Sequence, residues 1–335
     1  MYLKELCETD GVSGNEGAVR AFIEDKIRPY ADEIYTDNMG NLIAFKKGRI
    51  PKTIMLSAHM DEVGFIVSRI TDDGYLKFKT VGGIDPRVVV SKRVRIGSVP
   101  GIIALKAVHL QKPEEKETAV QISSLFIDIG ASSKEEAEKK VSIGDYVSFA
   151  TSYAEVGDKV KAKALDDRVG CGILIDLIMR ENIYDTYYVF GVQEEVGLRG
   201  AAVYAHNLKP DAALVLEGTT CSDVYGAKEH EYVTVCGGGA AVSFADRTTI
   251  VKRSFHRWLY DTALKNNIRV QYKRTTMGGN DAGAIHRAKD GILTASLSVP
   301  CRYIHSPVSV AAVSDIKAVY ELAALFTERW EEMLR

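Results

Sequence analysis

Apolar residues near the start of the chain recur at the spacing of an α-helix; they are Val19, Phe22, Ile23 and Ile27. Ser13, followed three residues later by Glu16, matches a capping box that would begin this helix. Short strands are predicted next at residues 33–36 and 42–46. A third apolar strand, at residues 53–57, runs directly into the sequence Ala-His-Met-Asp.

The middle of the chain has a different pattern, which predicts a small β-rich domain at residues 63–156. Valine-rich runs such as residues 87–96 alternate there with glycine turns. One helix is expected at residues 134–140, capped by Ser132 or Ser133.

From residue 157 onward, predicted strands alternate with predicted helices. Helices are expected at residues 169–180 and 249–266, from Ala201 onward, and at the C-terminus. Strands are expected at residues 187–193, 213–216 and 292–299. This alternation predicts an α/β fold, a mixed sheet flanked by helices. Residues 1–62 and 157–335 would form this one domain, with the β-rich segment inserted into it.

Composition narrows the classes of function. Of the 335 residues 46% are hydrophobic and 26% are charged, which is ordinary for a globular protein. The near balance of 43 basic and 45 acidic residues points to neither a nucleic-acid nor a membrane partner. Five cysteines without a C-x-x-C pair disfavour a disulfide framework or a zinc ribbon. With no signal peptide and no apolar run near ~18 residues, a cytoplasmic location is expected.

Polar residues follow the predicted strands where these end, and they are His59, Asp61, Glu194, Glu195, Glu217 and His305, while Asp166 and Asp167 open a predicted helix. Sites in α/β folds lie at the carboxyl ends of strands, so these side chains are expected to gather there. Each alone has an ordinary explanation as a surface residue or a helix cap. Together, crowded carboxylates would repel one another unless cations neutralise them. Imidazole and carboxylate ligands suit zinc, cobalt or manganese.

Two spacings add detail to this predicted site. Asp61 could accept the second ring N–H of a metal-binding His59. Neighbours in a strand point to opposite faces, so Glu194 and Glu195 can share a site only where the strand ends and turns, which Gly197 favours. One carboxylate could then bind metal while the other transfers protons.

Five segments in this order resemble the tetrahedral (TET) aminopeptidases, also called glutamyl or deblocking aminopeptidases and sometimes labelled cellulase M; they are Ser57–Gly64, Ala164–Gly170, Gln193–Gly200, Gly278–His286 and Arg302–Pro307. The resemblance spans nearly the whole chain. It implies the fold of the dinuclear zinc exopeptidases, with residues 63–156 as a dimerisation domain. It also implies a homo-oligomer in which dimers assemble into a dodecamer.

The resemblance further implies two divalent metal ions per subunit, held by His59 and Glu217 at one position, by Glu195 and His305 at the other, and by Asp166 between them. Glu194 would be the general base and Asp61 would orient His59. The peptide bond between Asp166 and Asp167 would be cis.

The function that follows is a metallo-aminopeptidase. It would hydrolyse N-terminal residues from peptides with a free N-terminus, through a water that bridges two metal ions, with zinc or cobalt favoured and manganese as a further choice. Many family members have Asp where this chain has Glu217, and Glu there can accompany carboxypeptidase activity in related dinuclear peptidases. Ser309 also stands where many members have Glu, with an effect expected on local structure.

Three alternatives therefore stay open at this stage. A carboxypeptidase-like enzyme or another dinuclear amidohydrolase would use the same metal ligands. An endoglucanase would use two carboxylates without a metal ion, which leaves His59 and His305 unexplained. A non-catalytic peptide-binding protein could keep the fold.

Other polar segments are expected to be structural or exposed. The histidines without a site motif are His109, His206, His230 and His256, and His286 lies inside the fourth segment. The glycines at residues 237–239 lack the spacing of a phosphate-binding loop. The charge run at residues 112–117 is expected to be an exposed loop.

Overall fold

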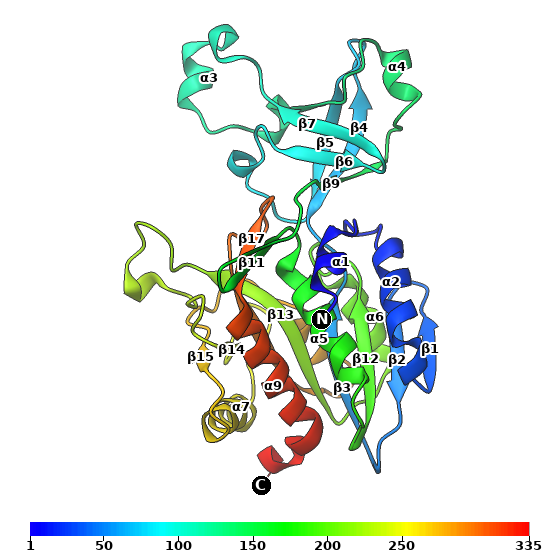
Figure 1. Cartoon of the computed structure of the whole chain (residues 1–335), viewed down its shortest axis with the longest axis vertical. Coiled ribbons are helices and arrows are strands. Elements are labelled where there is room, and N and C mark those ends of the chain that lie inside the picture. Colours follow the sequence, from blue (N-terminus) through cyan, green and yellow to red (C-terminus); the bar gives the residue numbers. More distant parts are fainter. Residues whose placement is uncertain (335) are drawn as a thin grey trace.

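Two bodies make up the computed structural model, which describes residues 1–334: a large α/β body and a small β-barrel, drawn at the top of Figure 1. The helices of the α/β body are α1 (Leu3–Glu8), α2 (Gly17–Ile27), α5 (Leu165–Ile178), α6 (Arg199–Asn207), α7 (Arg253–Lys265), α8 (Ala282–Ile285) and α9 (Val313–Arg329). Each of these helices is too short or too polar to cross a lipid bilayer, as are the barrel helices described below.

One mixed sheet runs through the α/β body. Its strands, in spatial order, are β1 (Glu33–Thr36), β2 (Leu42–Lys46), β12 (Tyr184–Gly191), β3 (Ile50–His59), β13 (Ala212–Cys221), β16 (Leu293–Arg302), β17 (Ser309–Ala312), β11 (Lys159–Ala162) and β10 (Ala154–Val156), with β14 (Ala240–Val242) and β15 (Val270–Tyr272) beside β16. The four central strands, β12, β3, β13 and β16, are parallel to one another. Their carboxyl ends therefore meet at one edge of the sheet.

Both faces of this sheet are buried, which explains the apolar strand sequences. Ile54 and Leu56 of β3 belong to the larger core, together with residues of α2, α5 and α9. Met55, between them, points to the opposite face and packs with residues of α6 and α8. This alternation follows from the two-residue period of a strand. It confirms the predicted α/β sheet with helices on both sides.

The β-barrel is inserted between β3 and β10. Its strands are β4 (Gly64–Ile70), β5 (Leu76–Val81), β6 (Arg93–Ile96), β7 (Val99–Ala104), β8 (Phe126–Asp128) and β9 (Tyr146–Phe149), and its helices are α3 (Pro113–Glu117) and α4 (Lys134–Glu138). The ring of Phe65 lies 4.9 Å from Phe78 and 5.3 Å from Phe149, both edge to face, at the centre of a separate apolar core. Ser133 caps α4, because its hydroxyl accepts the N–H of Glu136.

Two local predictions were wrong. The capping box does not form, because α2 begins at Gly17, the Ser13 hydroxyl donates instead to Asp61, and Glu16 accepts the N–H groups of Gly14 and Gln193. In the charge run at residues 112–117, the side chains of Lys112, Glu114, Lys116 and Glu117 are exposed, but residues 113–117 form the short helix α3 rather than a loop.

Candidate active site

Several of the predicted site residues lie at or near the carboxyl ends of the central strands. His59 is the last residue of β3, paired with Gly191 at the end of β12. Glu194 and Glu195 follow β12 by three and four residues. Glu217 was expected just past a strand, but β13 continues to Cys221, so Glu217 lies inside the strand.

Asp166 lies between the two imidazoles at the start of α5. Its Oδ1 is 3.4 Å from Nε2 of His59, and its Oδ2 is 3.6 Å from Nε2 of His305. Glu217 Oε2 lies 3.7 Å from the same nitrogen of His59. Glu195 Oε2 lies 3.2 Å from Nε2 of His305. One carboxylate thus separates two imidazole–carboxylate pairs, which is a geometry that suits two cations sharing a ligand.

Glu194 and Asp61 complete this cluster. Glu194 Oε2 is 4.0 Å from Nε2 of His59. Asp61 is fully buried on the other side of the ring, with its Oδ1 3.3 Å from Nδ1 of His59. The backbone N–H groups of Glu194 and Glu195 both donate to the Asp61 carboxylate, at 3.0 and 3.1 Å. Asp61 therefore contacts the histidine and also the turn that carries both glutamates.

Backbone conformations around the cluster are unusual. Ala164, Gln193 and His305 have left-handed φ angles of 53°, 56° and 55°, which side chains other than glycine rarely adopt. The peptide bond between Asp166 and Asp167 is cis. Gly218 lies directly against this segment, since a Cβ added there would be 2.8 Å from the Asp166 Cβ.

The protonation of the cluster reflects the crowding of its acids. Burial, with further repulsion from neighbouring carboxylates, raises the pKa of Glu195 to about 7 and that of Glu217 to about 8. Burial and the Glu217 carboxylate also raise the pKa of Glu194 well above its usual range. Burial alone would lower the pKa of His305, but Asp166 and Glu195 raise it to about 9. These four shifts all favour the protonated form. Asp166 differs, because burial would raise its pKa but His305 and His59 lower it.

The donor set of this cluster is suited to divalent metal ions. Within the described residues, Asp166 Oδ1 and Glu217 Oε1 are buried without a hydrogen-bond partner, which is costly unless a cation lies against them. Among the described residues, three groups of side chains have ligand atoms that lie within 4.8 Å of one another. The groups are His59 with Glu194 and Glu195, His59 with Asp167 and Glu217, and Asp166 with Glu195 and His305.

Asp167 is the member of these groups for which no role in the site was predicted. It is fully buried, and its carboxylate accepts the backbone N–H groups of His59 and Gly170, at 3.3 and 3.0 Å. Burial and the charges of Glu217 and Asp166 raise its pKa well above the ordinary value. In the sequence, only its position next to Asp166 indicated that Asp167 lies at the site.

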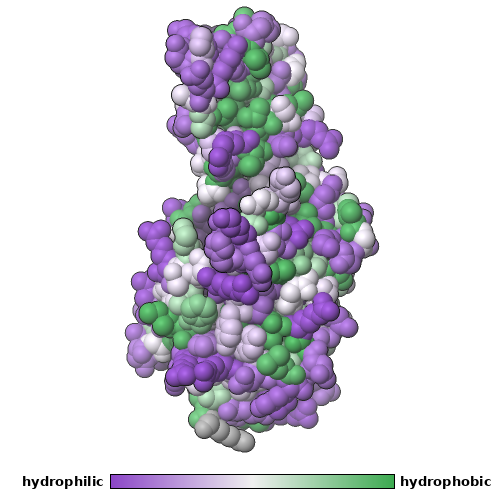
Figure 2. Space-filling view, turned by 90° about the vertical axis from the view of Figure 1, so that its left-hand side faces the viewer, coloured by the Kyte–Doolittle hydropathy of each residue, from purple (hydrophilic) through white to green (hydrophobic). Residues whose placement is uncertain are grey.

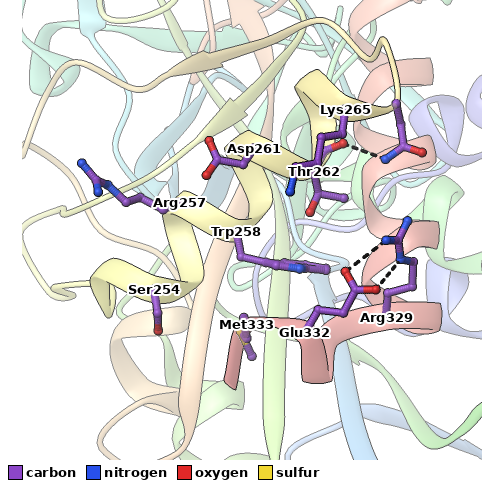
Figure 3. Close-up of a pocket in the computed structure, with 10 residues that line it drawn as sticks. Ser254, Arg257, Trp258, Asp261, Thr262, Lys265, Arg329, Glu332 and Met333 are labelled. Carbon is purple, nitrogen blue, oxygen red and sulfur yellow. Dashed lines mark hydrogen bonds and ion pairs between the residues drawn. The ribbon is translucent and has the colours of Figure 1, made fainter. Parts of the chain in front are cut away.

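The cluster opens into a cavity of about 340 Å³. Apart from the site residues, its walls come mainly from β13 and from the segment that follows β15, and they include Thr219, Thr220, Lys273, Thr275 and Asn280. A different cavity of about 290 Å³ lies between α7 and the C-terminal turn, beside Trp258 and the ion pair of Arg329 with Glu332 (Figure 3). No residue of the acidic cluster lines that second cavity.

Comparisons with known proteins show which family this chain resembles. A family model described as M42 glutamyl aminopeptidase matches residues 40–322. A putative aminopeptidase from Acetivibrio thermocellus is 41% identical over 96% of this chain and 96% of its own. The lysyl aminopeptidase of Pyrococcus furiosus is 32% identical over 99% of this chain and 97% of its own.

Solved structures extend this likeness to the fold. A TET aminopeptidase from a marine sediment archaeon, Thaumarchaeota archaeon SCGC AB-539-E09, superimposes with a TM-score of 0.94 at 37% identity, over 98% of this chain and 95% of that one. The TET1 peptidase of Pyrococcus horikoshii has a TM-score of 0.84 at 34% identity, over 96% and 97%. A structure named as an endoglucanase, from Thermotoga maritima, has a TM-score of 0.84 at 41% identity, over 100% and 99%.

The M42 family is generally metal-dependent, which agrees with the cluster of imidazoles and carboxylates described above. Because the family model covers most of the chain and the relatives match over almost their full length, the protein belongs to the M42 glutamyl aminopeptidase family and is a peptidase.

Proposed function

We propose that the protein is an aminopeptidase that removes N-terminal residues from peptides with the help of two divalent metal ions, zinc or cobalt, or else manganese. His59 and Glu217 would hold one ion, Glu195 and His305 the other, and Asp166 would bind both. The position of Asp166, 3.4 Å from one imidazole and 3.6 Å from the other, is the observation that carries this proposal.

The ions, when bound, would polarise the scissile carbonyl and lower the pKa of a water to near 7. Glu194 would act as the general base. It would take the proton of the attacking water and return it to the nitrogen of the leaving peptide.

The chain's own residues would also place the substrate. The free amino group of a peptide is a cation, and the carboxylates of Glu194, Glu195 and Glu217 line the cavity that it would enter. Recognition of that amino group would limit cleavage to the first peptide bond.

A carboxypeptidase-like enzyme is the second candidate, and Lys273 is the observation that favours it. This lysine lines the same cavity and could hold a substrate carboxylate. Peptides with an acetylated N-terminus separate the two candidates. We expect them to be inert, and their hydrolysis from the C-terminus would replace the aminopeptidase proposal.

Metal analysis combined with a substrate panel tests the proposed function. We expect two metal equivalents per chain, hydrolysis of aminoacyl-nitroanilides, loss of activity with a chelator and its recovery on adding zinc, cobalt or manganese. Release of sugar from cellulose by the chelated protein would instead support the endoglucanase alternative. A full panel of inert nitroanilides would contradict the proposal.

We further propose a homo-oligomer in which the β-barrel, within residues 63–156, forms the dimer contact and dimers assemble into a dodecamer. One P. horikoshii relative is described as a dodecamer and as able to form a tetrahedron or a large octahedral shell. The barrel exposes Ile102, Val108 and Leu110, and Figure 2 shows apolar residues on its surface. Light scattering should give twelve times the chain mass of 36.8 kDa, and the mass of a single chain would contradict the proposal.

The five cysteines are free thiols in the structure. Free thiols persist in a reducing compartment, so we propose the cytoplasm as the place where the enzyme works.

A further inference from the structure

The turn that presents Glu194 and Glu195 is held by side chains from the start of the chain. Beyond Gly191 the strand β12 ends, and four successive backbone N–H groups need new acceptors. Each finds a side-chain oxygen: Val192 donates to Asn41 (3.0 Å), Gln193 to Glu16 (3.2 Å), Glu194 to Asp61 Oδ1 (3.0 Å) and Glu195 to Asp61 Oδ2 (3.1 Å).

These acceptors fix a conformation that the chain would not hold by itself. Gln193 has a left-handed φ of 56°, which lets two adjacent side chains reach the same cluster. Hydrogen bonds to a carboxylate are about twice as strong as neutral ones, and here both carboxylates are buried. The backbone of the turn is therefore restrained on the side away from the cavity.

Ser13 and Glu16 connect this turn to the N-terminal segment. The Ser13 hydroxyl donates to Asp61 Oδ2 at 2.6 Å, and its own backbone N–H donates to the Glu62 carbonyl at 3.3 Å. The Glu16 Oε1 atom accepts the N–H of Gly14 at 2.8 Å in addition to that of Gln193. Ser13 and Glu16 are 5% and 4% exposed, and neither lines the substrate cavity.

We propose that Ser13 and Glu16 are positioning residues for the reaction: Glu16 holds the turn before Glu194, and Ser13 holds the Asp61 carboxylate that fixes Glu194 and Glu195. The proposal rests on the proposed function, because it assigns a task to Glu194 as base and to Glu195 as ligand. Loss of either contact lets the two glutamates shift relative to the substrate. Misplacement of this kind lowers turnover more than it lowers binding.

Four variants test this assignment: Ser13→Ala, Ser13→Thr, Glu16→Ala and Glu16→Gln. The alanine variants should lose about 10- to 100-fold in kcat with little change in KM, as is typical when a side chain supporting a ligand is removed. Ser13→Thr keeps the hydroxyl and Glu16→Gln keeps an acceptor oxygen, so both should recover most of the lost kcat. A residue that only stabilised the fold would lower the melting temperature without this pattern.

Two control variants measure the effect of stability alone. Ser133→Ala removes the hydroxyl that accepts the Glu136 N–H at the start of α4, in the barrel. Asp315→Asn changes a buried carboxylate that accepts the N–H groups of Gly237 and Gly239. Both should lower the melting temperature and keep the wild-type kcat.

Hydrogen exchange gives a readout that does not depend on activity. In Glu16→Ala the amides of residues 192–195 should exchange at least about tenfold faster than in the wild type, whereas in Ser133→Ala they should not. Unchanged exchange, or wild-type kcat in both alanine variants, would overturn the assignment of Ser13 and Glu16. A wild-type protein inert on every nitroanilide would instead contradict the proposed function, and the exchange comparison would still test the contacts.

Discussion

At the scale of single residues, the proposed mechanism assigns different tasks to two adjacent carboxylates. Glu195 lies 3.2 Å from His305, as its proposed role as a ligand requires, while Glu194 lies 4.0 Å from His59, and both line the cavity. Their backbone N–H groups are bound to one side chain, Asp61, so their relative position is fixed. Because the backbone is held in this way, a substitution that changes only the Glu194 carboxyl group tests the chemistry proposed for it.

The first prediction concerns that carboxyl group. Glu194→Gln should keep its metal content and lose about 10²–10⁴-fold in kcat, because an amide cannot take a proton from water. Metal analysis and nitroanilide turnover measure both quantities. Glu231→Gln, in an exposed turn, is the matched control and should have wild-type turnover. Near-wild-type turnover of Glu194→Gln would remove Glu194 from the mechanism.

The second prediction concerns Asp166. Replacing it by alanine removes the carboxylate whose two oxygens face His59 and His305, so Asp166→Ala should lose metal at both positions. Titration with zinc, followed by calorimetry, should give at least a 10- to 100-fold weaker affinity. Two ions bound with wild-type affinity would contradict a shared ligand.

At the scale of elements, the sequence predicted the sheet and the cluster well. The strands are buried on both faces, so their apolar runs were visible, and the polar residues at their ends stood out against them. Helix α1 was not predicted, because it is only six residues long and has no side-chain cap. Ser13 and Glu16 were misassigned because their partners Asp61 and Gln193 lie 48 and 177 residues away, a distance that local patterns cannot reveal.

A third prediction tests the contact between two of these elements. A Cβ at position 218 of β13 would lie 2.8 Å from the Asp166 Cβ and 2.9 Å from its Cα, so Gly218→Ala should displace Asp166. We expect weaker metal binding and a loss of about 1–3 kcal/mol of unfolding free energy. Chemical denaturation and metal titration measure these effects.

Gly172 provides the control for this variant. It lies inside α5, and a Cβ there would meet its nearest neighbour, Leu6 Cδ1, at 3.5 Å. Gly172→Ala should therefore be neutral or more stable by about 0.5–1 kcal/mol. If the two variants had equal metal affinity and equal unfolding free energy, the close approach of β13 to Asp166 would be unimportant.

At the scale of the whole molecule, an ion-pair network joins the N-terminal segment, the barrel and the α/β body. Asp10 pairs with Arg95 of β6 at 2.7 Å and with Lys163 at 3.2 Å. Lys163 is fully buried and also pairs with Glu62 at 2.5 Å. Burial alone would raise the pKa of Asp10, but Arg95 and Lys163 outweigh it and hold this pKa below its usual value.

The fourth prediction follows from that lowered pKa. The Asp10 carboxylate stabilises the fold above the pKa of the unfolded chain, about 4, and this contribution is lost as the pH falls through the lower folded value. Asp10→Asn should reduce the unfolding free energy by about 1 kcal/mol at pH 7, and its difference from wild type should be smaller at pH 3. Urea denaturation at pH 7 and at pH 3 measures this difference in unfolding free energy.

The exposed pair of Asp158 and Lys159 serves as the comparison for Asp10. Asp158→Asn should leave stability unchanged at both pH values, because solvent screens that pair. A difference between Asp10→Asn and wild type that stayed constant from pH 7 to pH 3 would contradict the role of the Asp10 charge.

The ion pair of Glu62 and Lys163 also has a mechanical effect, because it links two distant segments of the chain. Glu62 is the second residue before the first barrel strand, and Lys163 directly follows β11, on the returning chain. The ion pair therefore ties the chain that leaves for the barrel to the segment that enters α5, three residues from His59 on one side and three residues from Asp166 on the other. The inserted segment also approaches the cluster itself, since a Cβ at Gly82 would lie 3.4 Å from Glu195 Cβ and one at Gly83 would lie 3.6 Å from His305 Nδ1. A displacement of the barrel would therefore be transmitted to the proposed ligands, and this ion pair resists such a displacement.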